Sequence, residues 1–229
     1  MNISILMPCL NEEKTIEECI NKAKDYLSKN NLTGEIIVVD NNSMDNSVSK
    51  ALNLGAFVVF CNKRGYGAAL KKGIESCSYD YIIFGDCDCS YDFSNLDAFI
   101  SAFSHGAEYI NGNRFKGGIC KGAMSLLHRI GVLYLSGVAS IVYKTPLLDY
   151  HCGLRGLKKS SFNLTEIKSD GFEFATDIIA YAYKNKLKCY EVPVRLYKDK
   201  RNRKSHLNTI RDGFRHLILI LRGCLKCKD

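Results

Sequence analysis

The sequence predicts an α/β domain with a doubly wound, mostly parallel sheet that carries helices on both faces. Short runs of apolar, β-branched residues alternate along the first 90 residues with segments whose apolar residues recur at helical spacing. Strands that are apolar throughout are typical of a parallel sheet buried on both faces. A length of 229 residues is enough for one such domain with a sizeable core.

The order of the expected elements is the one that a doubly wound sheet requires. In the first half we expect strands over 3–7, 35–39, 56–60 and 81–84, with helices over 12–27, 45–54 and 65–77 between them. In the less regular second half we expect helices over 125–142, 171–186 and about 207–225, and strands within 148–157 and over 188–195. Ligands of such folds bind beyond the carboxyl ends of the strands, so the polar residues there are the candidates for function.

The strongest local signal is a pair of acids that follows the apolar strand over 81–84. Asp86 and Asp88 flank Cys87, and Ser90 comes two residues later. Two carboxylates at this spacing suit Mg²⁺ or Mn²⁺, which prefer oxygen ligands and often share them with substrate phosphates. Such a triplet on a surface is usually only solvated. Its place directly after a buried strand favours a metal and nucleotide site.

Three other acids have two interpretations each. Asp40 ends the strand over 35–39, where it either holds the following loop or accepts a hydrogen bond from a nucleoside. Glu173 and Asp177 lie four residues apart and share one face of a helix. That face is either solvated or brings one carboxylate to an acceptor substrate.

The net charge of +8 lies entirely in the last segment of the chain, because residues 195–229 hold eleven Lys or Arg and three Asp. This local excess indicates an anionic partner such as a phosphate or a lipid headgroup. The last expected helix is basic and amphipathic, so it lies on an anionic membrane surface or packs its apolar side on the core. Nucleic-acid binding is disfavoured, because few aromatic residues interleave with the basic ones.

The cysteines and the hydropathy pattern indicate a cytoplasmic protein. Eleven scattered cysteines are typical of reduced thiols, and we expect no leader peptide because strand-like sequence begins at residue 2. The longest uncharged stretch near the middle, 130–143, is shorter than the roughly 20 residues that span a bilayer, so we expect no transmembrane helix. Membrane contact is then peripheral, on the cytosolic face, or made through a partner protein.

Eight short motifs follow one another along nearly the whole chain. They are Pro8-Cys-Leu-Asn-Glu12, Val38-Val-Asp40-Asn-Asn-Ser, Asn62-Lys-Arg-Gly-Tyr-Gly-Ala-Ala-Leu-Lys-Lys-Gly73, Asp86-Cys-Asp-Cys-Ser-Tyr-Asp92, Asn111-Gly-Asn-Arg114-Phe, Asp149-Tyr-His-Cys-Gly-Leu-Arg155, Glu191-Val-Pro-Val and Lys204-Ser-His-Leu. Each motif alone is weak, but the ordered set is specific. The set resembles family-2 glycosyltransferases of the dolichol-phosphate mannose synthase type.

This resemblance implies a GT-A catalytic domain over 1–196, followed by a basic loop and helix over 197–229. It implies a nucleoside site made by Pro8, Leu10, Glu12, Val38 and Asp40. It implies that Asp86, Asp88 and Ser90, with Cys87 between them, hold a Mg²⁺ or Mn²⁺ ion and the diphosphate. It also implies that phosphates are approached by Arg114 and by the 200–206 loop, with Arg201, Lys204 and His206. Position 90 is Ser where many mannose-phosphate synthases have Gln.

The resemblance further implies an inverting transfer of a sugar from a GDP- or UDP-sugar to an acceptor. A polyprenyl phosphate acceptor is already anionic and needs no strong base. A hydroxyl of a glycan, sugar or peptide needs a carboxylate to take its proton. The candidates for that base are Glu173, Asp177 and Asp149, and Arg155 of the same motif joins the catalytic candidates. A nucleotide-sugar-binding module without activity is the alternative from another class.

Overall fold

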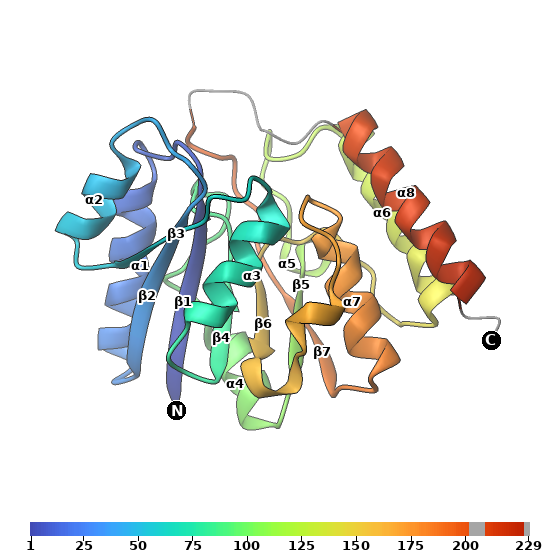
Figure 1. Ribbon diagram of the computed structural model, residues 1–229, viewed down its shortest axis with the longest axis horizontal. Coiled ribbons are helices and arrows are strands. Elements are labelled where there is room, and N and C mark those ends of the chain that lie inside the picture. Colours follow the sequence, from blue (N-terminus) through green and yellow to red (C-terminus); the bar gives the residue numbers. More distant parts are fainter. Residues whose placement is uncertain (202–208, 227–229) are drawn as a thin grey trace.

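Seven strands form one mixed sheet in the order β3-β2-β1-β4-β6-β5-β7 (Figure 1). The computed structural model describes residues 1–201 and 209–226. The strands are β1 (Asn2–Cys9), β2 (Thr33–Asp40), β3 (Phe57–Phe60), β4 (Tyr81–Phe84), β5 (Tyr109–Asn113), β6 (Arg155–Lys158) and β7 (Cys189–Pro193). The sheet therefore forms the centre of a doubly wound α/β fold, as the alternating pattern predicts.

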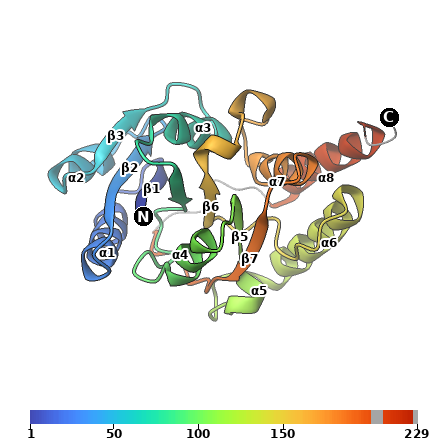
Figure 2. The same cartoon turned by 90° about the horizontal axis from the view of Figure 1, so that it is seen from below.

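Helices cover both faces of this sheet (Figure 2). They are α1 (Ile16–Lys29), α2 (Ser47–Asn53), α3 (Tyr66–Ser76), α4 (Asp97–Ser104), α5 (Arg114–Gly117), α6 (Leu126–Tyr143), α7 (Phe174–Lys184) and α8 (Thr209–Lys226). Helices α1 and α4 lie on one face, and α3 and α7 lie on the other (Figure 2). Helix α8 packs against α6 and α7 beyond the edge of the sheet.

The direction of β6 sets how the second half of the chain reaches the site. β1 pairs in parallel with β2 and β4, whereas β6 runs antiparallel to both of its neighbours, β4 and β5. The carboxyl ends of β1, β2 and β4 meet at one edge of the sheet. Because β6 is reversed, the residues that precede it arrive at that same edge. Both halves of the chain thus contribute to one side of the molecule.

The core consists of two layers of apolar side chains, one on each face of the sheet. Successive residues of a strand point to opposite faces. Ile5 packs with α1 on one side, and Leu6 packs with α3 on the other. The second layer continues outward to Ile220 of α8, which is fully buried. Helix α8 is thus anchored to the core through Ile220.

The predicted elements of the first half are confirmed with shifts of a few residues at their ends. Among the strands and α-helices of the described residues, three were not predicted, namely α4, β5 and the single turn α5. The strand expected within 148–157 is confirmed as β6, which lies at the end of that range and extends one residue beyond it, and the stretch before it is a loop. Of the predicted site residues, Lys204 and His206 lie outside the described part of the chain.

Among the described residues one helix is long and apolar enough to span a membrane, which contradicts the argument from length that led us to expect no transmembrane helix. Helix α6 has 18 residues with a mean hydropathy of 1.4, and it meets that criterion by length and composition. The uncharged stretch 130–143 is shorter than the helix, which begins at Leu126 and includes the charged Arg129. Only 17% of α6 is buried in the protein, so it is not an ordinary core helix.

Candidate active site

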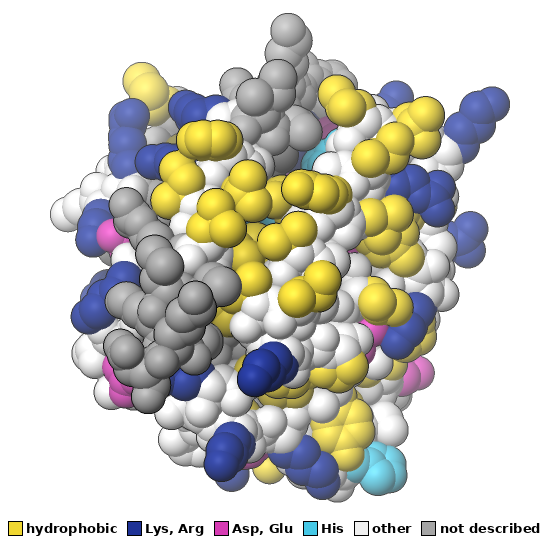
Figure 3. Space-filling model, turned by 90° about the vertical axis from the view of Figure 1, so that its right-hand side faces the viewer, with side chains coloured by type: hydrophobic (Ala, Val, Ile, Leu, Met, Phe, Trp, Pro, Cys, Tyr) yellow, Lys and Arg dark blue, Asp and Glu magenta, His cyan; other side chains and the backbone are white. Residues whose placement is uncertain are grey.

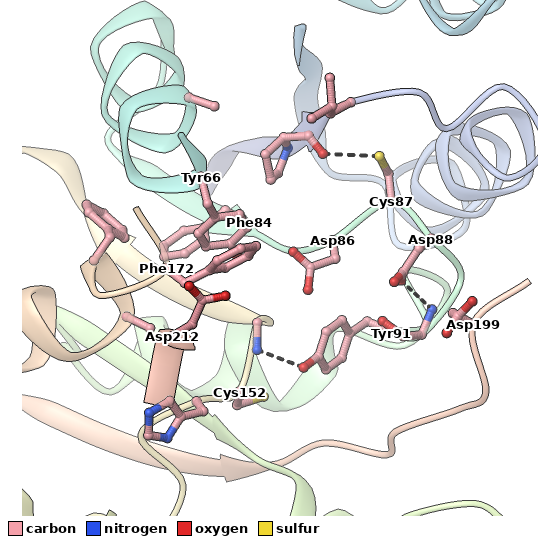
Figure 4. Close-up of a pocket in the computed structure, with 18 of the residues that line it drawn as sticks. Tyr66, Phe84, Asp86, Cys87, Asp88, Tyr91, Cys152, Phe172, Asp199 and Asp212 are labelled. Carbon is pink, nitrogen blue, oxygen red and sulfur yellow. Dashed lines mark hydrogen bonds between the residues drawn. The ribbon is translucent and has the colours of Figure 1, made fainter. Parts of the chain in front are cut away.

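A pocket of about 690 Å³ opens at the edge where β1 and β4 end (Figure 4). Its walls come from the segments after β1, β2, β3 and β4, from the loop before β6, and from α6, α7 and α8. This size is within the range of pockets that hold small ligands and cofactors. Ten of the predicted site residues line it together: Pro8, Leu10, Glu12, Asp86, Cys87, Asp88, Ser90, Arg114, Arg155 and Arg201.

The acidic pair lies at the floor of this pocket. Asp88 is buried, and its carboxylate accepts a hydrogen bond of 2.9 Å from the backbone N–H of Ser90. Asp86 faces the pocket, and Gly153 of the loop before β6 lies against it. A Cβ atom on Gly153 would lie only 2.5 Å from Asp86 Oδ2, so a side chain at this position would displace the Asp86 carboxylate. The loop before β6 therefore fixes the place of the first acid.

Burial and the neighbouring negative charge of Asp88 raise the pKa of Asp86 to about 6. A hydrogen bond from Tyr66 and the positive charges of Arg201 and Arg114 oppose this rise. Two close carboxylates in a partly buried position repel each other, and a cation between them relieves that repulsion. The electrostatics of the site therefore favour the binding of a cation.

These residues suit a hard divalent cation. Among the described residues, no three His, Cys, Asp or Glu side chains are arranged to enclose a metal ion. Two carboxylates with open positions are the arrangement that Mg²⁺ uses when substrate phosphates complete its shell. A positive group already contacts the pair, because Arg201 Nη2 lies 2.6 Å from Asp88 Oδ2. The site thus fits a metal that is bound together with a diphosphate.

Arg201 belongs to a segment that crosses the acidic loop. The backbone N–H of Tyr197 donates to the Ser90 carbonyl, and that of Lys200 donates to the Asp88 carbonyl, each at 3.0 Å. Arg201 also lies 3.5 Å from Glu12, at the end of β1. The start of the basic C-terminal segment is therefore attached to the acidic pair by backbone hydrogen bonds and by charge.

Aromatic rings form another wall of the pocket (Figure 4). Tyr66 of α3 stacks on Phe172, with ring centroids 5.3 Å apart, and Phe84 at the end of β4 lies beside them. Flat apolar rings next to a few polar groups are typical of sites that bind sugars or bases. This aromatic wall is not predictable from the sequence, because nothing in the spacing of Tyr66 and Phe172 shows that they meet.

Two residues predicted for the nucleoside site lie behind the pocket wall. Val38 is fully buried in the core. Asp40 accepts hydrogen bonds of 3.2 Å from the backbone N–H groups of Asn42 and Ser43, which hold the loop after β2. Asn41 and Asn42 of that loop line the pocket instead. A direct contact of Asp40 with a nucleoside stays a prediction.

Arg114 and Asp149 form a buried, two-pronged ion pair, with Nε–Oδ2 and Nη2–Oδ1 distances of 2.7 Å. The Arg114 backbone N–H also donates to Asp149, at 3.0 Å. Arg114 lines the pocket, whereas Asp149 is fully enclosed behind it. Asp149 therefore positions Arg114, and its carboxylate is already occupied.

Arg155 has a different environment, in which it donates to neutral oxygen atoms. Its guanidinium bonds the carbonyls of Cys152, Tyr150 and Ala175 at 2.7 Å each, and the Tyr109 hydroxyl at 2.9 Å. These contacts tie the loop before β6 to β5 and to the start of α7. Arg155 is thus a buried residue of the pocket lining that holds these segments together.

The two acids at the start of α7 contact residues other than those of the pocket. Glu173 pairs with Arg215 of α8 at 3.4 Å, and Asp177 accepts a hydrogen bond of 2.9 Å from the Ser169 backbone N–H. Neither lines the pocket. The acid on the pocket wall in this region is Asp212, in the first turn of α8. A role of Glu173 or Asp177 as the base stays a prediction.

Histidines from three elements line the end of the pocket near α6 and α8. They are His128 of α6, His151 before β6 and His216 of α8. The rings of His151 and His216 meet edge to face at 4.5 Å, and His216 Nδ1 lies 2.8 Å from the Thr176 hydroxyl. Burial and the charge of Arg155 lower the pKa of His216 to about 4, so it is neutral at pH 7. His151 lies within a predicted motif, but its meeting with α8 depends on tertiary packing.

Comparison with known proteins agrees with this geometry. Residues 4–164 match Glycosyl transferase family 2. The chain therefore belongs to glycosyl transferase family 2, as the motifs predict.

Among relatives, the chain is 33% identical over 221 residues to the low-salt glycan biosynthesis hexosyltransferase of Haloferax volcanii. The match covers 96% of this chain and 53% of that protein. It is 26% identical over 196 residues to the dolichol-phosphate mannosyltransferase of Pyrococcus furiosus, with 78% of this chain and 52% of that protein covered. The chain thus spans about half the length of these two relatives.

Among solved structures, the fold resembles glucosyl-3-phosphoglycerate synthase from Mycobacterium tuberculosis in complex with Mn²⁺, UDP-glucose and phosphoglyceric acid. The TM-score is 0.74 at 19% identity, and the match covers 97% of this chain and 79% of that one. At this identity the likeness establishes the fold, and the predicted GT-A fold is confirmed.

Replacement of Asp86 by Asn tests whether burial and the charge of Asp88 make the ionised Asp86 carboxylate destabilising. In excess chelator at pH 7, Asp86→Asn should raise the free energy of unfolding by about 2–3 kcal/mol, since the pKa rises from 3.8 to about 6 and each pKa unit is worth about 1.4 kcal/mol. Well below pH 3.8 the wild-type carboxyl is protonated in both the folded and the unfolded chain, so the difference vanishes. It grows between pH 4 and 6, because only the folded chain retains the proton. Urea unfolding across this range measures it, and a pH-independent difference would contradict the explanation.

Replacement of Asp149 tests the buried ion pair. Asp149→Ala should lower the free energy of unfolding by about 3–5 kcal/mol, because Arg114 is left as an uncompensated buried charge. The double change Arg114→Met with Asp149→Leu removes both charges and should be more stable than Asp149→Ala alone. Chemical unfolding of the three proteins makes the comparison. Equal losses in both variants would mean that packing, and not charge, causes the effect.

Proposed function

We propose that this chain is the catalytic domain of a metal-dependent, inverting glycosyltransferase that uses a nucleoside-diphosphate sugar. The observation that carries the proposal is the pair Asp86 and Asp88 at the end of a buried strand, in a pocket that a cationic side chain also enters. The ionised carboxylate of Asp86 does not stabilise the fold, since burial and the charge of Asp88 raise its pKa. Such a pair is explained by a cation that arrives with the substrate.

In this proposal Asp86 and Asp88 hold Mg²⁺ or Mn²⁺, and Ser90 supports Asp88 through its backbone N–H. The metal supplies positive charge to the leaving diphosphate. Arg201 lies within reach of the same position and adds a guanidinium, which binds phosphate oxygens in pairs. Stabilisation of the departing diphosphate by groups already in place is electrostatic catalysis. The fold neighbour from M. tuberculosis holds Mn²⁺ with UDP-glucose, which supports the choice of metal.

The acceptor that the site favours is a polyprenyl phosphate. The candidates for a base on the second half of the chain are engaged elsewhere, with Asp149 bound to Arg114, Glu173 near Arg215 and Asp177 bound to Ser169. An anionic phosphate oxygen attacks without a strong base. The dolichol-phosphate mannosyltransferase among the relatives supports the same class of acceptor. Such an enzyme works at the cytosolic face of a membrane.

Transfer to a hydroxyl is the second candidate, and one observation favours it. Asp212 contributes a buried carboxylate to the pocket wall, where a base for a hydroxyl acceptor would be needed. A screen of GDP- and UDP-sugars with polyprenyl phosphate and with sugar acceptors, read by product mass spectrometry, separates the two. A binding module without activity predicts that no donor is turned over or hydrolysed.

The acidic pair gives the direct test of the proposed activity. Asp88→Asn should abolish turnover and weaken donor binding by about 2–3 kcal/mol, because one charged ligand of the metal is lost. Asp92→Asn is the matched control, since Asp92 lies four residues further on and outside the pocket. Calorimetry and product detection measure both effects. Full activity of Asp88→Asn, or of the wild type in excess chelator, would refute metal dependence.

Arg201 gives a test that needs no turnover. Because its guanidinium contacts Asp88 at 2.6 Å, it competes with a metal ion when no donor is bound. Arg201→Gln should therefore bind Mn²⁺ more tightly in the absence of donor, by roughly 10-fold, and bind the nucleoside diphosphate more weakly in its presence. Electron paramagnetic resonance titration of Mn²⁺ measures the first effect. Lys200→Gln is the control, since Lys200 pairs with Glu18 instead. An unchanged or lower Mn²⁺ affinity in Arg201→Gln would show that the contact does not compete.

A further inference from the structure

Helices α6 and α8 lie side by side and together expose a broad apolar surface (Figure 3). We name it the α6–α8 face, and it is made of Leu126, Leu127, Ile130, Leu133, Tyr134, Ile141, Phe214, Ile218 and Leu221. The remaining large apolar side chains that the described residues expose are scattered over other elements. Single exposed apolar residues are ordinary on soluble proteins, but a contiguous patch marks a surface that another body covers.

Within this face the exposure is greatest on α6. Ile141 is 80% exposed, Leu126 73% and Leu127 71%. Helix α6 contacts the rest of the protein through a narrow stripe that includes Val132, Ser136 and Ala139. A surface helix normally turns its apolar stripe inward and its polar side outward. Helix α6 is apolar on its outer side too, so water is not the environment that this side suits.

The charges around the α6–α8 face are positive. The exposed charged side chains described on the two helices and in the turns next to them are Lys121, Arg129, Lys144, Arg211 and Arg215. The acid within this region, Asp212, is buried and faces the pocket. Apolar side chains bordered by Lys and Arg match the boundary between acyl chains and anionic headgroups of a bilayer. The charge pattern therefore favours a lipid surface as the occupant.

The inner sides of the same two helices line the active-site pocket. Val132 and Leu135 of α6 and Gly213 and His216 of α8 belong to its wall. The helices come close at Gly213, where an added Cβ would lie 3.8 Å from Leu135. The same two helices thus carry the α6–α8 face on their outer sides and form part of the wall of the pocket that holds Asp86 and Asp88 on their inner sides.

We propose that the α6–α8 face docks on an anionic lipid bilayer and presents the pocket to a phosphate group carried by a membrane lipid. This inference rests on the proposed function for the identity of that lipid, but the docking itself does not. The apolar side chains of α6 enter the headgroup boundary, and the surrounding Lys and Arg contact lipid phosphates. A lipid acceptor then reaches the pocket between α6 and α8 without leaving the membrane.

The absence of Trp from the sequence allows a direct test. Tyr134→Trp places a single fluorophore in the α6–α8 face, and Phe57→Trp places one at the other end of the sheet, where Phe57 is 60% exposed. With vesicles that contain phosphatidylglycerol at low salt, the emission of the Tyr134→Trp protein should shift to the blue and be quenched by brominated acyl chains. The Phe57→Trp protein should show neither effect. Raising the salt should reverse the response, because the charges that attract the protein are screened.

A triple variant connects docking to the apolar residues. Leu127→Gln, Ile130→Gln and Ile141→Gln together should lower the vesicle partition coefficient at least roughly 10-fold, whereas Phe57→Gln with Phe60→Gln should leave it unchanged. None of these residues lines the pocket, so hydrolysis of the nucleotide sugar in the absence of vesicles should be preserved. That assay shows that the triple variant is folded. It also separates a failure of docking from a failure of the proposed activity.

Three results would overturn the proposal. The first is equal quenching of the two Trp variants, and the second is vesicle binding of the triple variant at the wild-type level. The third is that light scattering shows a dimer for the wild type and a monomer for the triple variant, and that neither protein binds vesicles. That result would assign the face to a second copy of the chain. Docking with no transfer to any lipid phosphate would leave the α6–α8 face as a membrane surface and reject the lipid acceptor.

Discussion

Repulsion between Asp86 and Asp88 is the constraint around which the site is built. A buried strand delivers both carboxylates to one place, and Gly153 allows the backbone of the next wall to approach the first of them. Arg201 supplies an opposing charge from a segment that is more than 100 residues away in sequence. The surrounding polar atoms are largely committed to one another, as in the pair of Arg114 and Asp149. The positions left open are those that a metal and a diphosphate would fill.

The sequence predicted the first half of the fold because its signals are local. Apolar runs such as Ile82–Phe84 end at polar residues, and the helices between them keep a regular apolar spacing. The second half depends on tertiary contacts. Strand β5 contains the fully buried Asn111, whose side-chain amide donates a hydrogen bond to the Asp149 carbonyl in a distant part of the sequence. Strand β6 begins with Arg155, whose burial requires carbonyls from two other segments.

The same division applies to the site. Spacing and order identified Glu12, Asp86, Asp88 and Arg201, which the structure brings into one pocket. No pattern in the sequence indicates that His216 of α8 meets His151, since 64 intervening residues must fold first. Helix α6 was judged by its uncharged length alone. Its role depends on which of its sides packs against the protein and which stays exposed, and only the three-dimensional structure reveals that.

Because β6 runs in the reverse direction, the pocket is built from two separate parts of the chain. The acidic pair and the loops after β1, β2 and β3 are fixed by strand ends of the parallel half. The opposite wall comes from the residues that lead into an antiparallel strand and from α6 and α8. Insertions or exchanges between residues 118 and 148 can therefore remodel one wall, while Gly153 and the geometry of the acids are preserved. A scaffold of this kind lets selection alter what receives a sugar without rebuilding what delivers it.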